Sequence, residues 1–379
     1  MKILIITEFF PKSEKGELRG GVEARAFYMA KYLAEKYETH IICSREPHTS
    51  EEDNINNIKI HRCGPIRNYT QGGSITKRLS FIYQTIKKAR NIKPDLVDGY
   101  NWICYLATLK IAKKLNIPSI ATYHDVWIGD WIKNMGLISG ILGSIMEKYI
   151  LSKKWSLFIA NSKVTKNKLI KQNIKADKIS VVYNGVDFKK FNNINTQKDV
   201  EPTICYIGRL VKYKKVDILI KALKKIKNNL PQIKLKIIGS GPEINKIKTL
   251  AKNLDLENNI TFLGFIKNHE KVIAHLKKSH VFCLPSIVEG FGMVAVEAMA
   301  AGIPYVCTNI PPIREATKNG KGGLLFEKNN INDLKNKLLK ILLDNQLYQS
   351  LANEGPVYTK RYDWSKIGQE LEKTYYNLV

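Results

Sequence analysis

Two glutamates, Glu289 and Glu297, flank a glycine loop and the beginning of a helix-forming run. The apolar residues His280 to Leu284 before them are typical of a buried parallel strand. The peptide N–H groups of a first helical turn have no partner within the helix, so a helix start attracts anions, phosphate above all. A carboxylate beside that start can accept hydrogen bonds from sugar hydroxyls. The spacing therefore indicates a sugar-nucleotide site, and an ordinary strand-to-helix turn with two solvated glutamates fits it equally well.

Two cations, Arg209 and Lys214, follow the apolar run Thr203 to Ile207 and precede a helical segment. A guanidinium and an ammonium can neutralise the negative charge that grows on a diphosphate leaving group. In a chain with 61 lysines and arginines, however, a single lysine is ordinarily a solvated surface charge.

Three further candidates stand after expected strands. Gly21 ends a Gly-Gly pair in a glycine loop at residues 16–22, where backbone N–H groups can meet phosphate, although such a pair is more often only a turn. His124 lies at a strand end, where ligands gather in open α/β sheets, whereas a lone histidine is more often structural. Gly239 opens a Gly-Ser-Gly-Pro loop.

Apolar runs and helical segments alternate along the chain, which predicts an α/β protein with parallel sheets. At 379 residues the chain suits two domains. We expect two Rossmann-like, doubly wound parallel sheets, at residues 1–188 and 200–362, joined by a polar linker at 189–202. Residues 44–76 are expected to be irregular around one short strand, Ile58 to Ile60.

The stretch Glu289-Gly-Phe-Gly-Met-Val-Ala-Val-Glu297 resembles the signature of retaining family-four glycosyltransferases (glycosyl transferases group 1), which have the GT-B fold. Other motifs follow the family's order over nearly the whole chain: Gly20-Gly21, Lys93-Pro-Asp95, Thr122-Tyr-His-Asp125, Asn184-Gly-Val-Asp187, Gly208-Arg-Leu210, Gly239-Ser-Gly-Pro242 and Glu315. The resemblance implies an acceptor-side N-terminal domain and a donor-binding C-terminal domain facing a central cleft. It also implies that a final helix, 363–379, crosses back onto the N-terminal domain.

The resemblance assigns roles to the candidate residues. Four would be catalytic: Glu289, His124, Arg209 and Lys214. The donor would be bound by Gly21, Arg209, Lys214, Gly239, Phe291, Gly292, Met293 and Glu297. Within this set, Glu289 and His124 would contact the donor sugar and Glu297 the nucleotide ribose.

The chain departs from the family's pattern at two places. Lys215 stands where the family usually has glycine after the lysine, which puts the shape of that loop in question. Pro311-Pro312 replaces glycines that are common before the position of Glu315.

The formal net charge of +27 implies attraction to nucleic acid, anionic lipid or anionic small molecules, and a lysine-rich codon bias is the alternative. Four of the six cysteines lie in apolar runs and no C-x-x-C pair occurs, so we expect buried thiols in a reducing cytoplasm. The N-terminal apolar run is too short for a signal peptide, and no run reaches the roughly 18 to 20 residues of a spanning helix. A cytoplasmic protein is expected, with peripheral binding at the inner membrane face as one option.

Residues 126–155 combine tryptophans, a long uncharged run from Met135 to Met146, and lysines. This composition suits contact with an anionic membrane or a lipid-linked acceptor. An ordinary core helix of the N-terminal domain is the more common explanation of such a run.

We expect a glycosyltransferase that moves a hexose from a nucleoside diphosphate sugar to a hydroxyl on a lipid-linked, glycan or small-molecule acceptor, with retention implied by the resemblance. No Asp-x-Asp triplet or His/Cys cluster with ligand spacing occurs, so neither a metal nor another cofactor is expected. A sugar-nucleotide epimerase or a phosphorylase of the same fold is the first alternative. A basic nucleic-acid-binding protein is the second, although no aromatic-interleaved basic ribbon supports specific nucleic-acid binding. The base, the sugar, the acceptor and the oligomeric state are not specified by the sequence.

Overall fold

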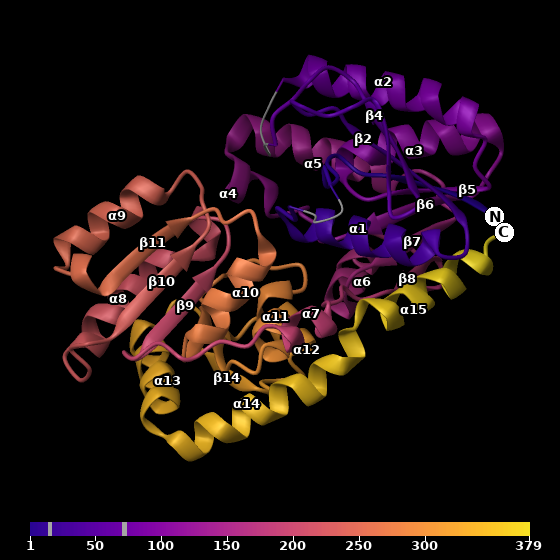
Figure 1. Cartoon of the computed structure of the whole chain (residues 1–379). Helices are drawn as coiled ribbons and strands as arrows, with labels where there is room; N and C mark the ends of the chain where they lie inside the picture. The colour runs from indigo at the N-terminus through magenta and orange to yellow at the C-terminus, as the bar shows by residue number, and fades with distance from the viewer. Residues whose placement is uncertain (14–16, 70–73) are drawn as a thin grey trace. The chain divides into compact units, whose positions relative to one another are not determined.

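The computed structural model describes residues 1–13, 17–69 and 74–379. Gly16, the first residue of the predicted glycine loop, and residues 70–73 of the expected irregular segment lie outside this description. The chain divides into two compact units (Figure 1). Unit 1 comprises residues 1–185 and 364–379, and unit 2 comprises residues 186–363.

Unit 1 is built on a sheet of eight strands among its described residues. The strands are β1 (Lys2–Ile6), β2 (Glu38–Ser44), β3 (Glu52–Ile55), β4 (Ile58–Cys63), β5 (Leu96–Gly99), β6 (Ser119–Tyr123), β7 (Leu157–Ala160) and β8 (Ile179–Val181). Their order is β3-β4-β2-β1-β5-β6-β7-β8, and every neighbouring pair is parallel except β3 with β4. The chain builds outward from β1 in one direction and then from β5 in the other, so the topological switch point lies between these two strands.

Helices cover both faces of this sheet. They are α1 (Gly21–Ala34), α2 (Ile75–Ile92), α3 (Trp102–Leu115), α4 (Trp131–Met135), α5 (Leu137–Leu151), α6 (Lys163–Ile170) and α15 (Trp364–Tyr376). Right-handed crossovers of opposite direction place α1 on one face and α2 and α3 on the other, as Figure 1 shows. Alternate residues of β1 follow this division: Leu4 and Ile6 pack with Phe81 of α2 and Ile103 of α3.

The C-terminal helix α15 completes unit 1. The Trp364 ring stacks on Tyr28 of α1, with ring centroids 5.1 Å apart. The Tyr375 hydroxyl donates to the buried Asp98 carboxylate of β5 at 2.6 Å. These contacts bind the last segment of the chain to the first sheet.

Unit 2 contains a second sheet, fully parallel. Its strands are β9 (Thr203–Ile207), β10 (Lys234–Ile238), β11 (Ile260–Gly264), β12 (Val281–Leu284), β13 (Tyr305–Thr308) and β14 (Gly323–Phe326). Its helices are α7 (Phe188–Asn193), α8 (Val216–Lys227), α9 (Ile244–Asn253), α10 (His269–Lys278), α11 (Met293–Ala300), α12 (Pro311–Ala316), α13 (Ile331–Leu343) and α14 (Asn345–Thr359). The strand order β11-β10-β9-β12-β13-β14 puts the switch point between β9 and β12.

The two parallel-sheet units confirm the predicted fold class, with two local differences. The expected irregular segment contains the antiparallel hairpin of β3 and β4. The expected linker begins with α7, whose first turn is capped by the Asp187 carboxylate, which accepts from Lys190 N at 3.1 Å.

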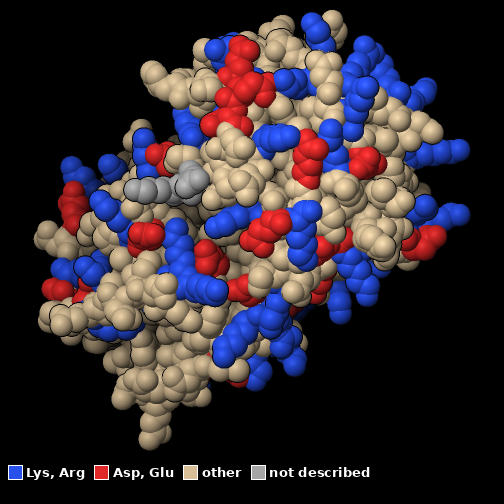
Figure 2. Space-filling model, turned by 45° about the vertical axis from the view of Figure 1, so that its right-hand side comes forward, with Lys and Arg blue, Asp and Glu red and all other residues tan. Residues whose placement is uncertain are grey.

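Charged side chains are spread widely over the surface. Figure 2 shows lysines and arginines across the face in view, with acidic side chains among them. Within the described ranges, no helix is both long enough and apolar enough to cross a membrane.

Candidate active site

The loops that follow β9 and β10 approach each other closely beside the switch point of unit 2, which lies between β9 and β12. Gly208 N donates to Ile238 O at 3.0 Å, and Leu210 N donates to Ser240 O at 2.9 Å. A Cβ at Gly239 would lie 2.0 Å from Gly208 O, and the φ of Gly239 is +132°. Only glycine fits this position, because a side chain would collide with the neighbouring backbone.

The predicted cation Lys214 and the predicted sugar-binding Glu289 form an ion pair. Lys214 Nζ lies 2.5 Å from Glu289 Oε1, and the two side chains are only 12% and 11% exposed. Lys214 belongs to a 3₁₀ turn after β9, and Glu289 belongs to the loop after β12. A backbone hydrogen bond from Ile287 N to Tyr213 O, 2.9 Å long, joins the same two loops. The pair therefore marks the point where two neighbouring strands end.

Arg209 lies in the same loop as Lys214 and is half-buried. Its Nη2 donates to the Tyr213 hydroxyl at 2.6 Å. Its backbone oxygen accepts from the Tyr206 hydroxyl at 3.0 Å. These bonds fix the loop on both sides of the guanidinium.

Lys215 adopts the left-handed backbone conformation, with φ +53° and ψ +38°. This is the conformation that glycine adopts without strain and that a residue with a Cβ adopts at a cost of about 1 kcal/mol. The loop thus keeps a shape suited to glycine although the chain has lysine there. The turn ends at Lys215, and α8 begins at the next residue.

The loop after β12 leads into the start of α11. Gly292 is the residue before this helix, with φ +90°, and a Cβ there would lie 2.4 Å from Ile313 Cδ1. Phe291 is buried, and its ring packs edge-on against Tyr362 with centroids 5.4 Å apart. Met293 is the first helical residue. The backbone of Phe291, Gly292 and Met293 is therefore held in place by packing.

Glu297 lies in α11 one turn after Met293 and is largely withdrawn from water, with its side chain 19% exposed. Burial raises the pKa of this carboxyl to about 7. The imidazole of His269, on α10, lies beside it: His269 Nε2 is 3.7 Å from Glu297 Oε1, a distance too long for a hydrogen bond. Burial, with a smaller effect of Lys190, lowers the pKa of His269 to about 4. At pH 6 the carboxyl consequently faces a neutral imidazole.

His269 was not among the residues predicted from the sequence. It is the first residue of α10, which the Asn268 side chain caps by accepting from Glu270 N at 2.8 Å. No local pattern links it to Glu297, because the two meet only through the packing of separate helices.

In unit 1, His124 follows β6 directly. Its Nε2 is buried and, within the part of the chain that the structure describes, has no hydrogen-bond partner. Burial and the nearby Arg25 guanidinium lower the pKa of His124 to about 3, so the imidazole is neutral at physiological pH. The neighbouring Asp125 carboxylate accepts from Lys168 at 2.7 Å.

Arg25 was also missed by the sequence analysis. It is fully buried on α1, four residues after Gly21, which is the first residue of that helix. Its Nη1 donates to Val182 O at 2.9 Å, Tyr183 O at 2.8 Å and Asn184 Oδ1 at 3.0 Å. The sequence feature that could have indicated Arg25 is an arginine on the apolar face of a predicted helix. Only the fold shows which oxygens accept its hydrogen bonds.

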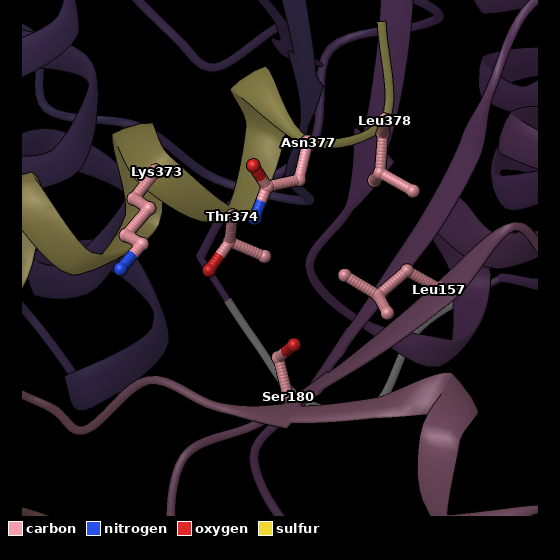
Figure 3. A pocket seen from close by; sticks show the side chains of 6 residues that line it. All are labelled: Leu157, Ser180, Lys373, Thr374, Asn377 and Leu378. Atoms are coloured by element: carbon pink, nitrogen blue, oxygen red, sulfur yellow. The ribbon is translucent and has the colours of Figure 1, made fainter.

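The structure thus brings together Arg209, Lys214, Gly239 and the 289–297 segment around the switch point of unit 2. Gly21 and His124 belong to unit 1 and are described within it. A pocket of about 330 Å³ in unit 1 contains none of these residues (Figure 3). It is lined by Leu157, Ser180, Lys373, Thr374, Asn377 and Leu378. Among the described residues, no group of three or more His, Cys, Asp or Glu side chains could hold a metal ion.

Two family models match the chain. The model described as glycosyl transferases group 1 matches residues 187–357, and the model described as glycosyltransferase family 4 matches residues 19–190. Each match falls largely within one of the two units.

Individual proteins agree with these matches. An uncharacterized glycosyltransferase of Methanocaldococcus jannaschii is 31% identical over 389 residues, with 100% of this chain and 99% of that one covered. The N-acetylgalactosamine-N,N'-diacetylbacillosaminyl-diphospho-undecaprenol 4-alpha-N-acetylgalactosaminyltransferase of Campylobacter jejuni is 27% identical over 374 residues, covering 93% and 95% of the two chains. The HepE protein of Anabaena, solved in complex with UDP-glucose, superposes with a TM-score of 0.78 at 20% identity and full coverage of both chains. The chain is therefore a glycosyltransferase with the GT-B fold, and it belongs to glycosyl transferases group 1 (glycosyltransferase family 4).

Proposed function

We propose that the protein transfers a hexose from a nucleoside diphosphate sugar to an acceptor hydroxyl with retention of anomeric configuration. The observation that supports this most directly is the Lys214–Glu289 pair at the switch point of unit 2. A cation suited to a departing diphosphate and a carboxylate suited to a sugar lie within hydrogen-bond distance of each other there.

Arg209 and Lys214 neutralise the charge that develops on the diphosphate as the bond from the anomeric carbon to the phosphate oxygen breaks. The N–H groups at the start of α11 add a positive potential at the same place. Glu289 and the neutral His124 hold the sugar while oxocarbenium character grows on its ring. Gly21 and Gly239 contribute backbone contacts to the donor.

Glu297 binds the ribose hydroxyls. Because burial raises the pKa of this carboxyl to about 7, much of it is protonated at neutral pH in the free protein. Two hydroxyl donors stabilise the ionised form, so donor binding is expected to release a fraction of a proton from Glu297.

The donor and the acceptor are proposed by chemical class. HepE was solved with UDP-glucose, and a uridine diphosphate hexose is the first donor to test. The Campylobacter relative is named for a diphospho-undecaprenol acceptor, so a lipid-linked acceptor in cell-envelope or glycan biosynthesis is the class we propose. Such a reaction would take place at the cytoplasmic face of the inner membrane.

The experiment that tests this function measures thermal unfolding with a panel of UDP, GDP and ADP hexoses and the free nucleotides. A ligand at 100 times its dissociation constant stabilises the folded state by about 2.7 kcal/mol, which raises the midpoint by several degrees. One base family should give this shift in the native protein and in Lys212→Ala, which removes an exposed lysine of the same turn. Lys214→Ala should lose most of it.

The reaction itself is followed by release of nucleoside diphosphate from the donor that binds, in detergent extracts of lipid-linked acceptors. Retention is read from the anomeric proton coupling of the product. A flat panel with every donor, or loss of the shift in Lys212→Ala equal to that in Lys214→Ala, would contradict the proposed site.

A further inference from the structure

Helices α4 and α5 of unit 1 expose a group of large apolar side chains, which we call the α4–α5 face. Its members are exposed by between 42% (Met135) and 77% (Ile138). They are Ile132, Met135, Leu137, Ile138, Ile141, Leu142, Ile145 and Tyr149. Exposed aliphatic side chains are common singly, whereas a group of this size indicates a binding surface.

The spacing of these residues puts them on one side of α5. Ile138, Ile141, Leu142, Ile145 and Tyr149 recur every three or four residues, which is the period of one helical face. The stripe is about 16 Å long, since each residue of a helix rises about 1.5 Å. At 15 residues, α5 is too short to cross a bilayer, and its stripe suits a helix that lies along a surface.

The inner side of α5 is firmly packed, so the outer stripe is not a core face left open by loose docking. Ile150 and Leu151 belong to the cluster that includes Phe158 of β7. A Cβ added at Gly140 would lie 2.4 Å from Ile132 Cα, and one at Gly143 would lie 2.5 Å from Trp131 Cε3. The expectation of an ordinary core helix is therefore wrong for the outer half of α5.

Glu147 fastens the two helices together from within. Its carboxylate accepts from Trp131 Nε1 at 2.7 Å and from Trp127 N at 3.2 Å. Burial raises the pKa of this carboxyl to about 7, with the two donors opposing the effect. These hydrogen bonds hold α4 and α5 together and join α5 to Trp127, which is three residues after His124 in the chain.

The exposed charges on α4 and α5 are all positive, and the partly exposed Asp130 stands directly before α4. Residues 131–154 contain a single acidic residue, Glu147, whose side chain is buried. The same segment has four exposed lysines: Lys133, Lys148, Lys153 and Lys154. The ammonium of Lys153 lies 4.0 Å from the centre of the Tyr149 ring. An apolar stripe bordered by lysines and an aromatic ring complements an anionic lipid surface, where aliphatic groups enter the acyl boundary and lysines meet the headgroups.

We propose that the α4–α5 face docks the protein on an anionic membrane surface. A second copy of the chain fits this face poorly, because a symmetric pairing would bring the exposed lysines of two copies together, with Asp130 as the one acid at least partly exposed within residues 130–154 of each. The docking inference is independent of the transfer reaction. Its consequence, that a membrane-embedded acceptor is presented on the side of unit 1 that carries His124, rests on the proposed function.

The test is flotation of the full chain with vesicles of phosphatidylcholine alone and with vesicles of phosphatidylcholine and phosphatidylglycerol in equal parts. The native protein should bind the anionic vesicles and bind the neutral ones at least about tenfold more weakly. Ile138→Ser with Ile145→Ser should weaken partitioning into the anionic vesicles by about tenfold or more, since two aliphatic side chains no longer enter the lipid. Leu142→Ser, at another exposed position, should weaken it in the same direction.

The matched control is Ile75→Ser with Leu79→Ser, which removes two comparably exposed aliphatic side chains, 66% and 58%, from α2 of the same unit. This variant should bind anionic vesicles as the native protein does. Equal unfolding midpoints establish that all variants are folded, and nucleoside diphosphate release from the donor into water, measured without vesicles, should be unchanged in each of them. If the native protein released no nucleoside diphosphate, the proposed function would be contradicted, whereas the vesicle-binding result would be unaffected.

Three outcomes would overturn the docking proposal. The native protein could fail to bind anionic vesicles at low salt. The α5 variants could bind as tightly as the native protein, which would assign binding to the dispersed lysines alone. Sedimentation could show a dimer that Ile138→Ser with Ile145→Ser dissociates, which would assign the face to a second copy of the chain.

Discussion

The ammonium of Lys214 lies 2.5 Å from the carboxylate of Glu289, although 75 residues separate them in the chain. Both side chains are nearly buried, so removal of either leaves a charge without its partner in a poorly hydrated place. We expect Lys214→Ala and Glu289→Ala each to lower the free energy of unfolding by about 3 kcal/mol, and the double variant to lose less than the sum. Urea unfolding of the four proteins gives the coupling energy, which should be about 1 to 3 kcal/mol. A coupling near zero would mean that the pair is not formed in solution.

The left-handed conformation of Lys215 makes a second prediction. Lys215→Gly should raise the free energy of unfolding by up to about 1 kcal/mol, because glycine adopts φ +53° without strain. Lys215→Ala removes the same charge and keeps the strain, so it should not stabilise. Denaturant titrations of both variants separate the two effects. Equal stabilisation by alanine and glycine would show that charge repulsion, and not backbone strain, is relieved.

Gly292 carries two constraints, a left-handed φ and a close neighbour. Gly292→Ala should cost about 2 to 4 kcal/mol of unfolding free energy, since the new Cβ meets Ile313 Cδ1. Gly264→Ala is the control for φ alone, because Gly264 has φ +67° and open space around its Cβ direction, and it should cost only about 1 kcal/mol. Adding Ile313→Val to Gly292→Ala removes Cδ1 and should recover the difference. If the two alanine variants are equally destabilised, the contact with Ile313 does not matter.

The raised pKa of Glu297 makes stability depend on pH. The folded protein keeps this proton up to about pH 7, whereas the unfolded chain loses it near its ordinary value of 4.5. The contribution of Glu297 to stability therefore falls as the pH rises from about 4.5 to 7. Glu297→Gln should be more stable than the native protein by up to about 3 kcal/mol at pH 8 and about equal to it at pH 4. Urea unfolding across this range measures the difference, and a constant difference between the two proteins would argue against the buried proton.

The same substitution should weaken donor binding. A carboxamide is uncharged and has one acceptor oxygen where a carboxylate has two, so Glu297→Gln should lose about tenfold or more in donor affinity at pH 8 by calorimetry. His269→Phe, which alters the neighbouring ring and leaves the carboxylate, serves as the comparison. Unchanged affinity in Glu297→Gln would remove Glu297 from the ribose site.

Metal independence is a further prediction. With Arg209 and Lys214 opposing the diphosphate charge, transfer in excess EDTA should stay within about twofold of the rate with added Mg²⁺. Initial rates with EDTA, Mg²⁺ and Mn²⁺ decide this. Loss of activity in EDTA that either ion restores would show that the cations of the chain are insufficient.

Much of the fold could be predicted because buried parallel strands are nearly continuous apolar runs, as in β1, β9 and β12. Strand β3 was missed because Glu-Asp-Asn-Ile has no apolar run and pairs only at a sheet edge. Helix α7 was missed because six residues are too few to show a helical period.

The candidate site, too, could be predicted only in part from the sequence. The sequence motifs identified Glu289, Glu297, Arg209 and Lys214 as candidates. The contact between Lys214 and Glu289 could not be predicted, because it depends on the strand order, which makes β9 and β12 neighbours. The shape of the loop at Lys215 could not be predicted either, because a lysine in the sequence gives no sign of a positive φ. Likewise, the uncharged run of α5 fitted both a core helix and a membrane contact, and only the fold showed which half of the helix is covered.

The pairing of Val186 with Tyr362 and Asp363, just after α14, gives unit 2 a property of its own. Val186 N donates to Tyr362 O at 2.7 Å, and Val186 bridges Asp363 in parallel, so the first and last residues of this unit lie together. Unit 2 is thus one continuous segment inserted into the sequence of unit 1, and its two ends are adjacent in space. A few glycines would therefore suffice to join the two ends of an isolated unit 2 into a circular chain. In unit 1 without this segment, Gly185 would be joined to Trp364.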